Sequence, residues 1–365
     1  MLGVGAQEAS PAAGAEAAGL AAPPVTIATV PLAVDQTKGP HGESATGFDA
    51  VSLTADELAQ IQGGDYKAAI LMHTSSAFTN ALEQGAGDAF KAMNIEVIAQ
   101  TDAGMDPAKQ QSDTETVLAR NPNIILTLPI DPVQAAAAFR PAVDAGVKLV
   151  LLSNVPDGFE QGKDYVGIVT DDLFGIGRAA AEMLGDAMGG QGKVGYIFHD
   201  ADYYVTNRRD EAFKTVLQEQ YPDLPIADEQ GMANPADAES IASAMLTRDP
   251  EINAFYVPWA EPAEGVLAAL RAAGRDDVKV VTIDLDTTVA LDMAQGGAMV
   301  GIAADTPYQL GFTMALIGAY GVLGKEAPPF TIVPTIKVTR DNLPEAWEAS
   351  LHEAPPQEIL DALKA

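Results

Sequence analysis

The sequence predicts an α/β protein with two doubly wound, Rossmann-like lobes. Nine apolar runs of strand length recur along the chain, and most are apolar throughout, as is typical of parallel strands covered on both faces. The runs are 68–72, 97–99, 124–128, 149–152, 165–169, 194–198, 254–257, 278–283 and 299–303. Helical patterns separate them, which predicts right-handed crossovers, and nine strands fit two sheets better than one.

The intervening segments have the spacing of helices. Apolar residues recur every three or four positions in 78–93, 238–245 and 266–270, and Gly274 is placed to end the last of these helices. Ser52–Leu58 has the composition of a capped helix start. These segments are predicted to cover the faces of the two sheets.

Composition excludes several classes of function. The 365 residues include 51 acidic and 21 basic side chains, for a formal charge of −30, so phosphate backbones would repel the chain and no nucleic-acid partner is expected. No polybasic segment would bind anionic lipid, and no apolar run is long enough for membrane insertion. The absence of cysteine excludes disulfides and thiolate chemistry.

The first 47 residues differ from the rest. They are rich in Ala, Gly and Pro with little periodicity, which predicts a flexible N-terminal arm over 1–47. Met1–Pro24 lacks the basic start of an intact signal peptide, and we interpret it as the remainder of a trimmed one.

One motif is typical of nucleotide binding. Gly175-Ile-Gly177-Arg-Ala-Ala180 matches a GxGxxA pattern between a predicted strand and a helix, and Asp200 follows about 20 residues later. Five residues separate the strand from the glycines, too many for the tight turn, and two of them are acids that would repel a pyrophosphate. We therefore favour glycines that let a helix pack closely, and keep an NAD-linked dehydrogenase as the alternative.

No catalytic, cofactor or metal site is predicted. The four histidines have no metal-ligand spacing, and the nucleophile and phosphate-loop motifs are absent. Asp284-Leu-Asp286 is similar to the start of a calcium loop but lacks its Gly and Glu.

Polar residues and one tryptophan follow most of the predicted strands, at the edge where parallel sheets bind ligands. They are His73, Ser75, Ser76, Asp131, Ser153, Asn154, Asp171, Asp172, His199, Asp200, Trp259, Asp284 and Asp305. One Asp at a strand end is usually a helix N-cap, which suffices for Asp171 or Asp172. The whole series favours a carbohydrate, because carboxylates accept hydroxyl hydrogen bonds and an indole face packs on sugar C–H groups.

Residues 66–338 resemble the pentose- and hexose-binding type I periplasmic binding proteins, of the ribose-binding kind. The likeness rests on the order and spacing of five stretches. They are AILMHTSSAFTNALEQGA from Ala69, TDAGMDPAKQQSD from Thr101, LPIDP from Leu128, AEGVLAALRAAG from Ala263 and VVTIDLDTTVALDMAQGG from Val280.

The resemblance implies a set of ligand contacts. Phe78 falls where an aromatic packs on the sugar, and Thr79 stands where the next aromatic would be. Trp259 replaces the usual Asn, Asp305 stands where Gln is frequent, and Asn207 where many relatives have Arg. The full implied set is His73, Ser75, Ser76, Phe78, Thr79, Asp131, Asn154, Asn207, Arg208, Trp259, Asp284 and Asp305. The departures favour a short polyol or a four- or five-carbon sugar.

The resemblance also implies an architecture and a function. A three-crossing hinge would join a first lobe (48–152 and 306–327) to a second (153–305 and 328–346), followed by a C-terminal segment (347–365). Such a protein is an extracytoplasmic or periplasmic monomer. It captures a small neutral sugar or sugar alcohol (C4–C6) by hinge closure and delivers it to a membrane ABC permease in a transient contact. The alternatives are an NAD-linked polyol dehydrogenase and a two-lobed sensory or signal-molecule receptor.

Overall fold

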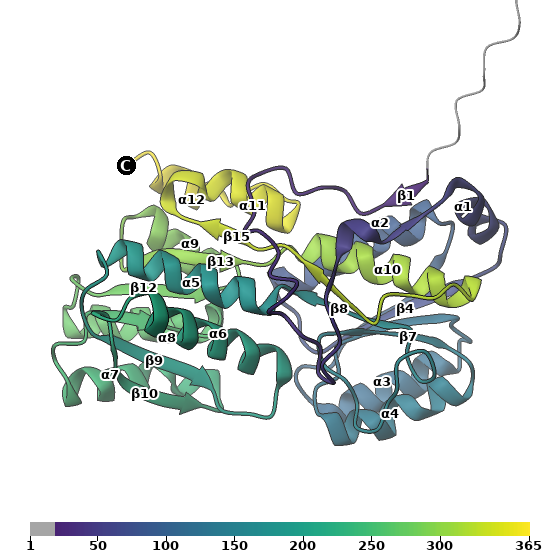
Figure 1. The fold of residues 1–365 in the computed structure, drawn as a ribbon, viewed down its shortest axis with the longest axis horizontal. Helices are drawn as coiled ribbons and strands as arrows, with labels where there is room; N and C mark the ends of the chain where they lie inside the picture. The colour runs from purple at the N-terminus through teal and green to yellow at the C-terminus, as the bar shows by residue number, and fades with distance from the viewer. Residues whose placement is uncertain (1–18) are drawn as a thin grey trace, which may run out of the picture.

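Two α/β lobes lie side by side in the computed structural model, which describes residues 19–365 (Figure 1). The part of the predicted arm before residue 19 lies outside these residues. Each lobe is a twisted sheet with helices on both faces, so the predicted fold class is confirmed.

The first lobe has a seven-stranded parallel sheet in the order β2-β14-β8-β7-β6-β4-β5. Its strands are β2 (Thr46–Gly47), β4 (Lys67–Met72), β5 (Glu96–Asp102), β6 (Ile124–Thr127), β7 (Lys148–Leu152), β8 (Gly167–Asp171) and β14 (Phe330–Val333). Its helices are α1 (Ala55–Gln62), α2 (Ala77–Ala92), α3 (Pro107–Leu118), α4 (Pro132–Asp144) and α10 (Pro307–Leu323). A short 3-10 turn, η1 (Phe48–Ala50), and a two-stranded ribbon of β1 (Leu20–Ala21) with β3 (Ser52–Leu53) lie beside α1.

The second lobe has a six-stranded sheet in the order β10-β9-β11-β12-β13-β15, in which only the edge strand β15 is antiparallel. Its strands are β9 (Val194–His199), β10 (Ile226–Met232), β11 (Ala254–Tyr256), β12 (Lys279–Ile283), β13 (Met299–Ala304) and β15 (Ile336–Val338). Its helices are α5 (Leu173–Ala187), α6 (Tyr204–Gln220), α7 (Ala238–Arg248), α8 (Ala260–Ala273), α9 (Thr287–Ala294), α11 (Leu343–Leu351) and α12 (Gln357–Ala362), with the 3-10 turns η2 (Pro235–Asp237) and η3 (Arg340–Asn342).

The sheets correct the predicted lobe boundaries at 152/153 and 327/328. Strands β8 and β14 pair with each other, and β8 pairs with β7, so both complete the first sheet. The first lobe therefore comprises 46–171 and 306–333, and the second 172–305 and 334–365. The chain crosses between lobes after β8, after β13 and after β14. The C-terminal segment is part of the second lobe, since Trp347 is buried in its core.

The segment 19–47 corrects the prediction of a flexible arm. Strand β1 pairs with β3, and β2 extends the first sheet at its β14 edge. Between these strands the chain lies across both lobes (Figure 1).

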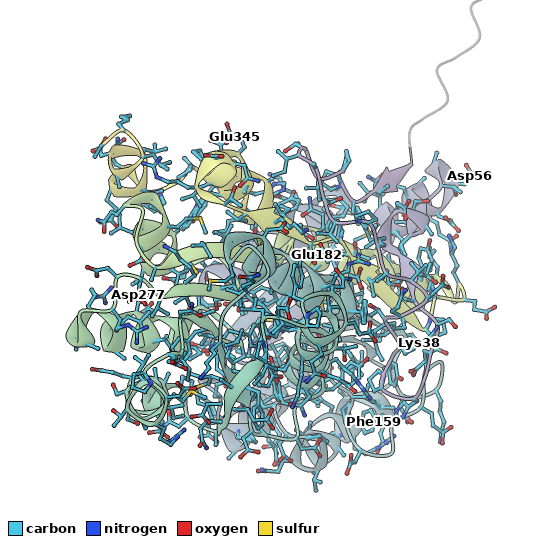
Figure 2. All side chains as sticks on the ribbon, turned by 60° about the vertical axis from the view of Figure 1, so that its left-hand side comes forward. Lys38, Asp56, Phe159, Glu182, Asp277 and Glu345 are labelled. Atoms are coloured by element: carbon cyan, nitrogen blue, oxygen red, sulfur yellow. The ribbon has the colours of Figure 1, made fainter. Side chains whose placement is uncertain are left out.

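The acidic surface extends over both lobes. The exposed carboxylates Asp56, Asp277 and Glu345 lie on well-separated elements (Figure 2). None of the helices among residues 19–365 is long and apolar enough to cross a bilayer.

Gly177 of the GxGxxA motif serves helix packing, as the sequence predicted for this motif, whereas Gly175 leaves room for the N-cap side chain of Asp172. A Cβ on Gly177 would lie 2.4 Å from the carbonyl oxygen of Arg209 and 2.7 Å from the Cβ of Ala212. Helix α5 therefore contacts α6 backbone to backbone. Gly274 has φ +64° and ends α8 in the left-handed conformation, as expected.

We expect Gly177→Ala to lower the free energy of unfolding by about 1–3 kcal/mol, because the added methyl group forces α5 and α6 apart. Gly87→Ala is the matched control, since a Cβ there meets nothing within 4 Å. Its free energy of unfolding should rise by up to about 1 kcal/mol, because Ala is favoured over Gly in a helix interior. Urea unfolding of both variants measures the difference. Equal stability of the two variants would contradict the packing role.

Candidate ligand-binding site

Four charged side chains meet where the two lobes face each other. Asp171 ends β8, Asp284 follows β12, Asp305 follows β13, and Arg209 projects from the first half of α6. Each carboxylate acts electrostatically on Arg209. We call these four residues the charge cluster. It lies at the carboxyl ends of parallel strands, where doubly wound sheets bind ligands.

Arg209 is the only basic residue of the charge cluster, and it is 5% exposed. Its Nη1 lies 3.6 Å from Asp284 Oδ1, and its Nη2 donates to the carbonyl oxygen of Pro258 at 3.4 Å. Asp284 is held in the left-handed region, at φ +67°, directly after the buried strand β12. One guanidinium thus faces three carboxylates, and the cluster is acidic overall.

This excess of acid opposes ionisation. Burial raises the pKa of Asp171 to about 7, although Arg209 acts in the opposite direction. Burial also raises the pKa of Asp305 well above its usual value, and the negative charges of Asp171 and Asp284 raise it further. A site of this kind favours groups that donate hydrogen bonds and disfavours an added anion.

Several buried polar atoms of the charge cluster and of strand ends in the first lobe have no hydrogen-bond partner within the protein. Among the residues that the structure describes, twelve buried side-chain atoms lack a hydrogen bond, and half of them belong to the charge cluster or to strand ends of the first lobe. These six are His73 Nδ1, Asn154 Oδ1, Asp171 Oδ1, Arg209 Nε, Asp284 Oδ1 and Asp305 Oδ1. Each unpaired buried group costs about 1–3 kcal/mol. Such a concentration is typical of a surface that hydrogen-bonds a polar ligand.

Aromatic side chains flank the charge cluster. Trp259, at the start of α8, is half-buried and meets the ring of His199 edge-on at 5.1 Å. The ring of Tyr203 also meets that of His199 edge-on, at 5.6 Å. His199 Nδ1 lies 2.7 Å from the hydroxyl of Thr206, and burial and Arg209 lower its pKa. An imidazole that is neutral and contacts two aromatic rings forms, with them, a largely apolar wall.

The two lobes touch around this site. Ala81 of the first lobe packs in the core of the second, and Tyr203 and Val205 of the second pack in the core of the first. Asn154, after β7, donates to the carbonyl oxygen of Pro129 at 3.0 Å and lies beside the Tyr203 hydroxyl. The molecule therefore has its lobes together, with Asn154 and Arg209 contributed from opposite sides.

Several predicted contacts also serve helix capping. Asp131 accepts from the backbone of Gln134 at 2.7 Å and caps α4. Ser76 and Thr79 form a capping box at the start of α2. Ser75 is exposed at this edge, and Phe78 packs partly against the core of the first lobe. Capping explains Asp131, Ser76 and Thr79 without a ligand, and whether any of these predicted residues contacts one stays a prediction.

Helix α6 presents a different arginine from the one predicted. Asn207 and Arg208 are exposed; Asn207 donates to Ala201, and Arg208 pairs with Glu211 at 2.8 Å. Arg209 points inward instead. The signal was present in the sequence, since Arg209 lies four residues before Phe213 and four after Val205, on the apolar stripe of α6.

The adjacent acids at the end of β8 divide their roles. Asp172 is the N-cap of α5 and accepts from Gly175 at 3.0 Å, whereas Asp171 belongs to the charge cluster. The N-cap account therefore holds for Asp172 alone. Asp200, after β9, is exposed and lies outside the cluster.

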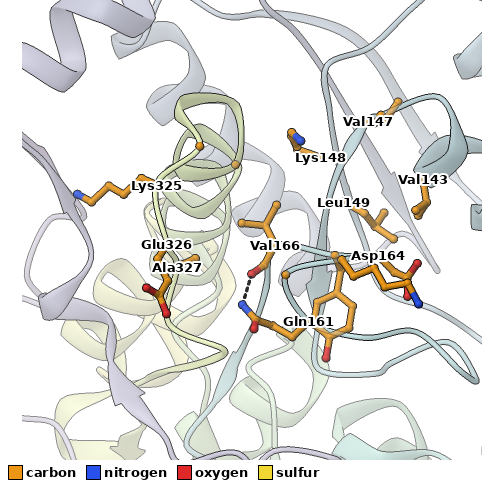
Figure 3. A pocket seen from close by; sticks show the side chains of 16 residues that line it. Val143, Val147, Lys148, Leu149, Gln161, Asp164, Val166, Lys325, Glu326 and Ala327 are labelled. Atoms are coloured by element: carbon orange, nitrogen blue, oxygen red, sulfur yellow. Dashed lines mark hydrogen bonds between the residues drawn. The ribbon is translucent and has the colours of Figure 1, made fainter.

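A separate hollow of about 450 Å³ lies at the opposite end of the first sheet (Figure 3). It opens between the start of β7, the segment 161–166 and the end of α10. Its wall includes Lys148, Lys325 and Glu326, and Gln161 donates within it to the carbonyl oxygen of Val166. Because it lies at the amino ends of the strands, we do not assign the ligand to it. No group of residues able to hold a metal ion occurs within 19–365.

The fold and this site define a two-lobed solute-binding protein, with its polar surface between doubly wound lobes. The chain belongs to the periplasmic binding protein family: a family model described as a periplasmic binding protein domain matches residues 68–326. The resemblance inferred from the sequence motifs is confirmed.

Curated relatives and solved structures agree with this assignment. The ribose import binding protein RbsB of Escherichia coli (strain K12) is 24% identical over 73% of this chain and 88% of its own. The xylitol-binding protein of Mycolicibacterium smegmatis is 23% identical over 80% of this chain and 82% of its own. A solute-binding protein from Agrobacterium vitis, solved with α-D-tagatopyranose, is 22% identical, covers 76% of this chain and 96% of its own, and has a TM-score of 0.69.

We expect Asp305→Asn to stabilise the ligand-free protein at alkaline pH. The raised pKa of Asp305 means that the fold binds a proton more tightly than the unfolded chain does. This stabilisation is complete below the usual pKa of about 4 and is lost as pH rises through the folded-state pKa. In urea unfolding, the free energy of unfolding of the variant should exceed that of the wild type by about 1–3 kcal/mol at pH 8 and by less at pH 4.5.

Asp131→Asn is the control for this experiment, because Asp131 lies outside the charge cluster and caps a helix. It should show no gain at pH 8. A larger gain for Asp305→Asn at pH 4.5 than at pH 8 would contradict the proposed repulsion.

Proposed function

We propose that this protein captures a small neutral sugar or sugar alcohol between its lobes and delivers it to a membrane ABC permease. The observation that carries the proposal is the group of unpartnered atoms around the charge cluster. Four of the six are acceptors on Asn154, Asp171, Asp284 and Asp305. Hydroxyl groups donate to such oxygens, and a protonated carboxyl group can in turn donate to a hydroxyl oxygen.

The wall of the site supports a carbohydrate further. Trp259 offers an indole ring beside the charge cluster, and such rings pack on the C–H faces of sugars. Relatives named for ribose, xylitol and D-allose agree with this ligand class. An aldonic acid or sugar phosphate would add negative charge next to three carboxylates, at a cost of kcal/mol magnitude.

Binding would proceed by hinge closure. Contacts from Asn154 on one lobe and Arg209 on the other stabilise the closed arrangement, which the permease then recognises. In this proposal the protein is an exported monomer that makes and breaks no covalent bond. The ring of His199 is engaged with the hydroxyl of Thr206.

The dehydrogenase alternative finds no support at α5. The backbone amides of Phe174 and Gly175 already donate to Thr37 and Asp172, so they are not free for a pyrophosphate. A two-lobed sensory receptor would use the same binding site, and it differs from a transport protein only in its partner.

A thermal-shift panel tests the ligand class. We expect erythritol, xylitol, ribose or allose to raise Tm, because a ligand stabilises by RT ln(1 + [L]/Kd), and ribonate to raise it less than ribose. Asp284→Asn should weaken binding of the best neutral compound more than Arg208→Ala, the exposed control. The compound should be recovered unchanged after incubation with and without NAD(P).

Three results would contradict the proposal. They are tighter binding of ribonate than of ribose, a reaction product, and a larger loss of affinity from Arg208→Ala than from Asp284→Asn.

Trp259 should be both a contact and a reporter of the ligand. The chain has two tryptophans, and Trp347 is buried in the core of the second lobe. Trp347→Phe should therefore keep the ligand-induced change in fluorescence, and Trp259→Phe should lose it. Trp259→Ala should weaken binding by about 2 kcal/mol or more, as aromatic hot spots do. Normal binding by a folded Trp259→Ala would show that the indole is not part of the site.

A further inference from the structure

Residues 19–47, which we call the strap, contact both lobes. Leu20 and Ala22 pack against the core of the first lobe, and Val25 and Ile27 pack against the core of the second. Farther along, Leu32 packs against the first lobe again. Figure 1 shows this purple segment passing from α1 towards α11 and then down between the lobes. The strap thus crosses the hinge in addition to the three chain crossings.

The strap also contacts each of those crossings. Near the crossing after β13, Gln309 donates to the carbonyl oxygen of Pro23 at 3.5 Å. At the crossing after β14, Val30 donates through its backbone to Thr335 at 2.8 Å. At the crossing after β8, the backbone of Ala33 donates to Asp172 Oδ2 at 2.6 Å. One segment therefore joins all three points about which the lobes would rotate.

Thr37 makes two further contacts between the strap and the crossing after β8. Its hydroxyl donates to Asp172 Oδ1 and accepts from the backbone of Phe174 at 3.2 Å. Thr37 is 2% exposed and Asp172 is 1% exposed. The first turn of α5 is therefore capped by Asp172 and by a residue of the strap together, and the helix N-terminus stabilises the carboxylate.

This contact lies one residue from the candidate site. Asp172 follows Asp171, a member of the charge cluster, so the strap and the site are attached to successive residues of one crossing. A second link runs through α6, because Tyr204 donates from its hydroxyl to the carbonyl oxygen of Lys38 and lies next to Tyr203. The strap is therefore connected to the site-forming residues through two separate sets of contacts.

We propose that the strap is a hinge restraint, which holds the lobes near their closed arrangement through the contact between Thr37 and Asp172. Separating the lobes strains or breaks contacts of a segment attached to both. These contacts therefore stabilise the closed state relative to the open state. Where the closed state is the minor one, a change in the closed–open equilibrium constant changes the apparent affinity for a ligand that binds the closed state by the same factor. The proposal uses the ligand-binding function only for its affinity readout.

Thr37→Val in the full chain tests the restraint, because it removes the hydroxyl and keeps the side-chain shape. The ligand-free variant should have a larger radius of gyration by small-angle scattering and faster exchange of the amides of Val30 and Ala33. Its affinity for xylitol should fall roughly three- to tenfold, the effect of losing one or two hydrogen bonds that favour closure.

Thr114→Val is the matched control. Thr114 is also buried, and its hydroxyl makes one hydrogen bond, to the carbonyl oxygen of Gln110 at 2.8 Å within α3. It should change Tm without changing the radius of gyration. The hinge-restraint proposal is wrong if Thr37→Val leaves the radius of gyration and the amide exchange as in the wild type. It is also wrong if both variants lose affinity and the loss simply follows the decrease in Tm.

Failure of the ligand hypothesis would look different. If the wild-type protein binds neither xylitol nor another neutral member of the panel, the proposed function is wrong. Scattering and exchange of the ligand-free variants then still decide whether the strap restrains the hinge.

Discussion

A guanidinium group taken out of water needs negative charge around it, and this requirement organises the region between the lobes. Arg209 is nearly fully buried on α6, and the acids that balance it come from the ends of three different strands. Asp171 belongs to the first sheet, whereas Asp284 and Asp305 follow strands of the second. In this closed arrangement α6 is therefore positioned by acids from both sheets, and the close approach of α5 at Gly177 holds its backbone.

Three carboxylates exceed what one guanidinium can neutralise. This excess is not explained by stability and points to a role in ligand binding. A fold optimised for stability alone would carry fewer buried acids, because an uncompensated buried charge is destabilising. One buried oxygen on each of Asp171, Asp284 and Asp305 lacks a hydrogen-bond partner within the protein. A molecule rich in hydroxyl groups compensates such oxygens without adding charge, which is why the electrostatics and the proposed ligand class agree.

The sequence was informative where burial is uniform along an element. Strands such as β4 and β6 are covered on both faces and read as continuous apolar runs. Strand β10 was missed because it is an edge strand in which exposed Ala227 and Glu229 alternate with less exposed residues. Strands β14 and β15 were missed because they follow the last helix of the first lobe in a segment interrupted by prolines.

The site was harder to predict than the sheets, because it depends on side-chain direction at single positions. Moving one residue along a helix turns the side chain by about 100°, so Arg208 faces water where Arg209 faces the acids. A similar step separates Asp172, which caps α5, from Asp171 in the charge cluster. The strap was predicted to be flexible because its contacts are tertiary, such as Thr37 with Asp172, and leave no periodic pattern in the sequence.

In our proposal, these opposing interactions place the lobes near the balance between open and closed states that a binding protein requires. Repulsion among the carboxylates of the charge cluster favours separation of the lobes, because water then screens each charge. Apolar contacts across the interface, such as those of Ala81 and Val205, favour closure, and so does the strap in our proposal. If either side dominated, a ligand could not shift the equilibrium, since it contributes only its differential affinity for the two states. A few hydrogen bonds from ligand hydroxyl groups to the surplus acceptors contribute enough free energy to shift such an equilibrium from the open to the closed state.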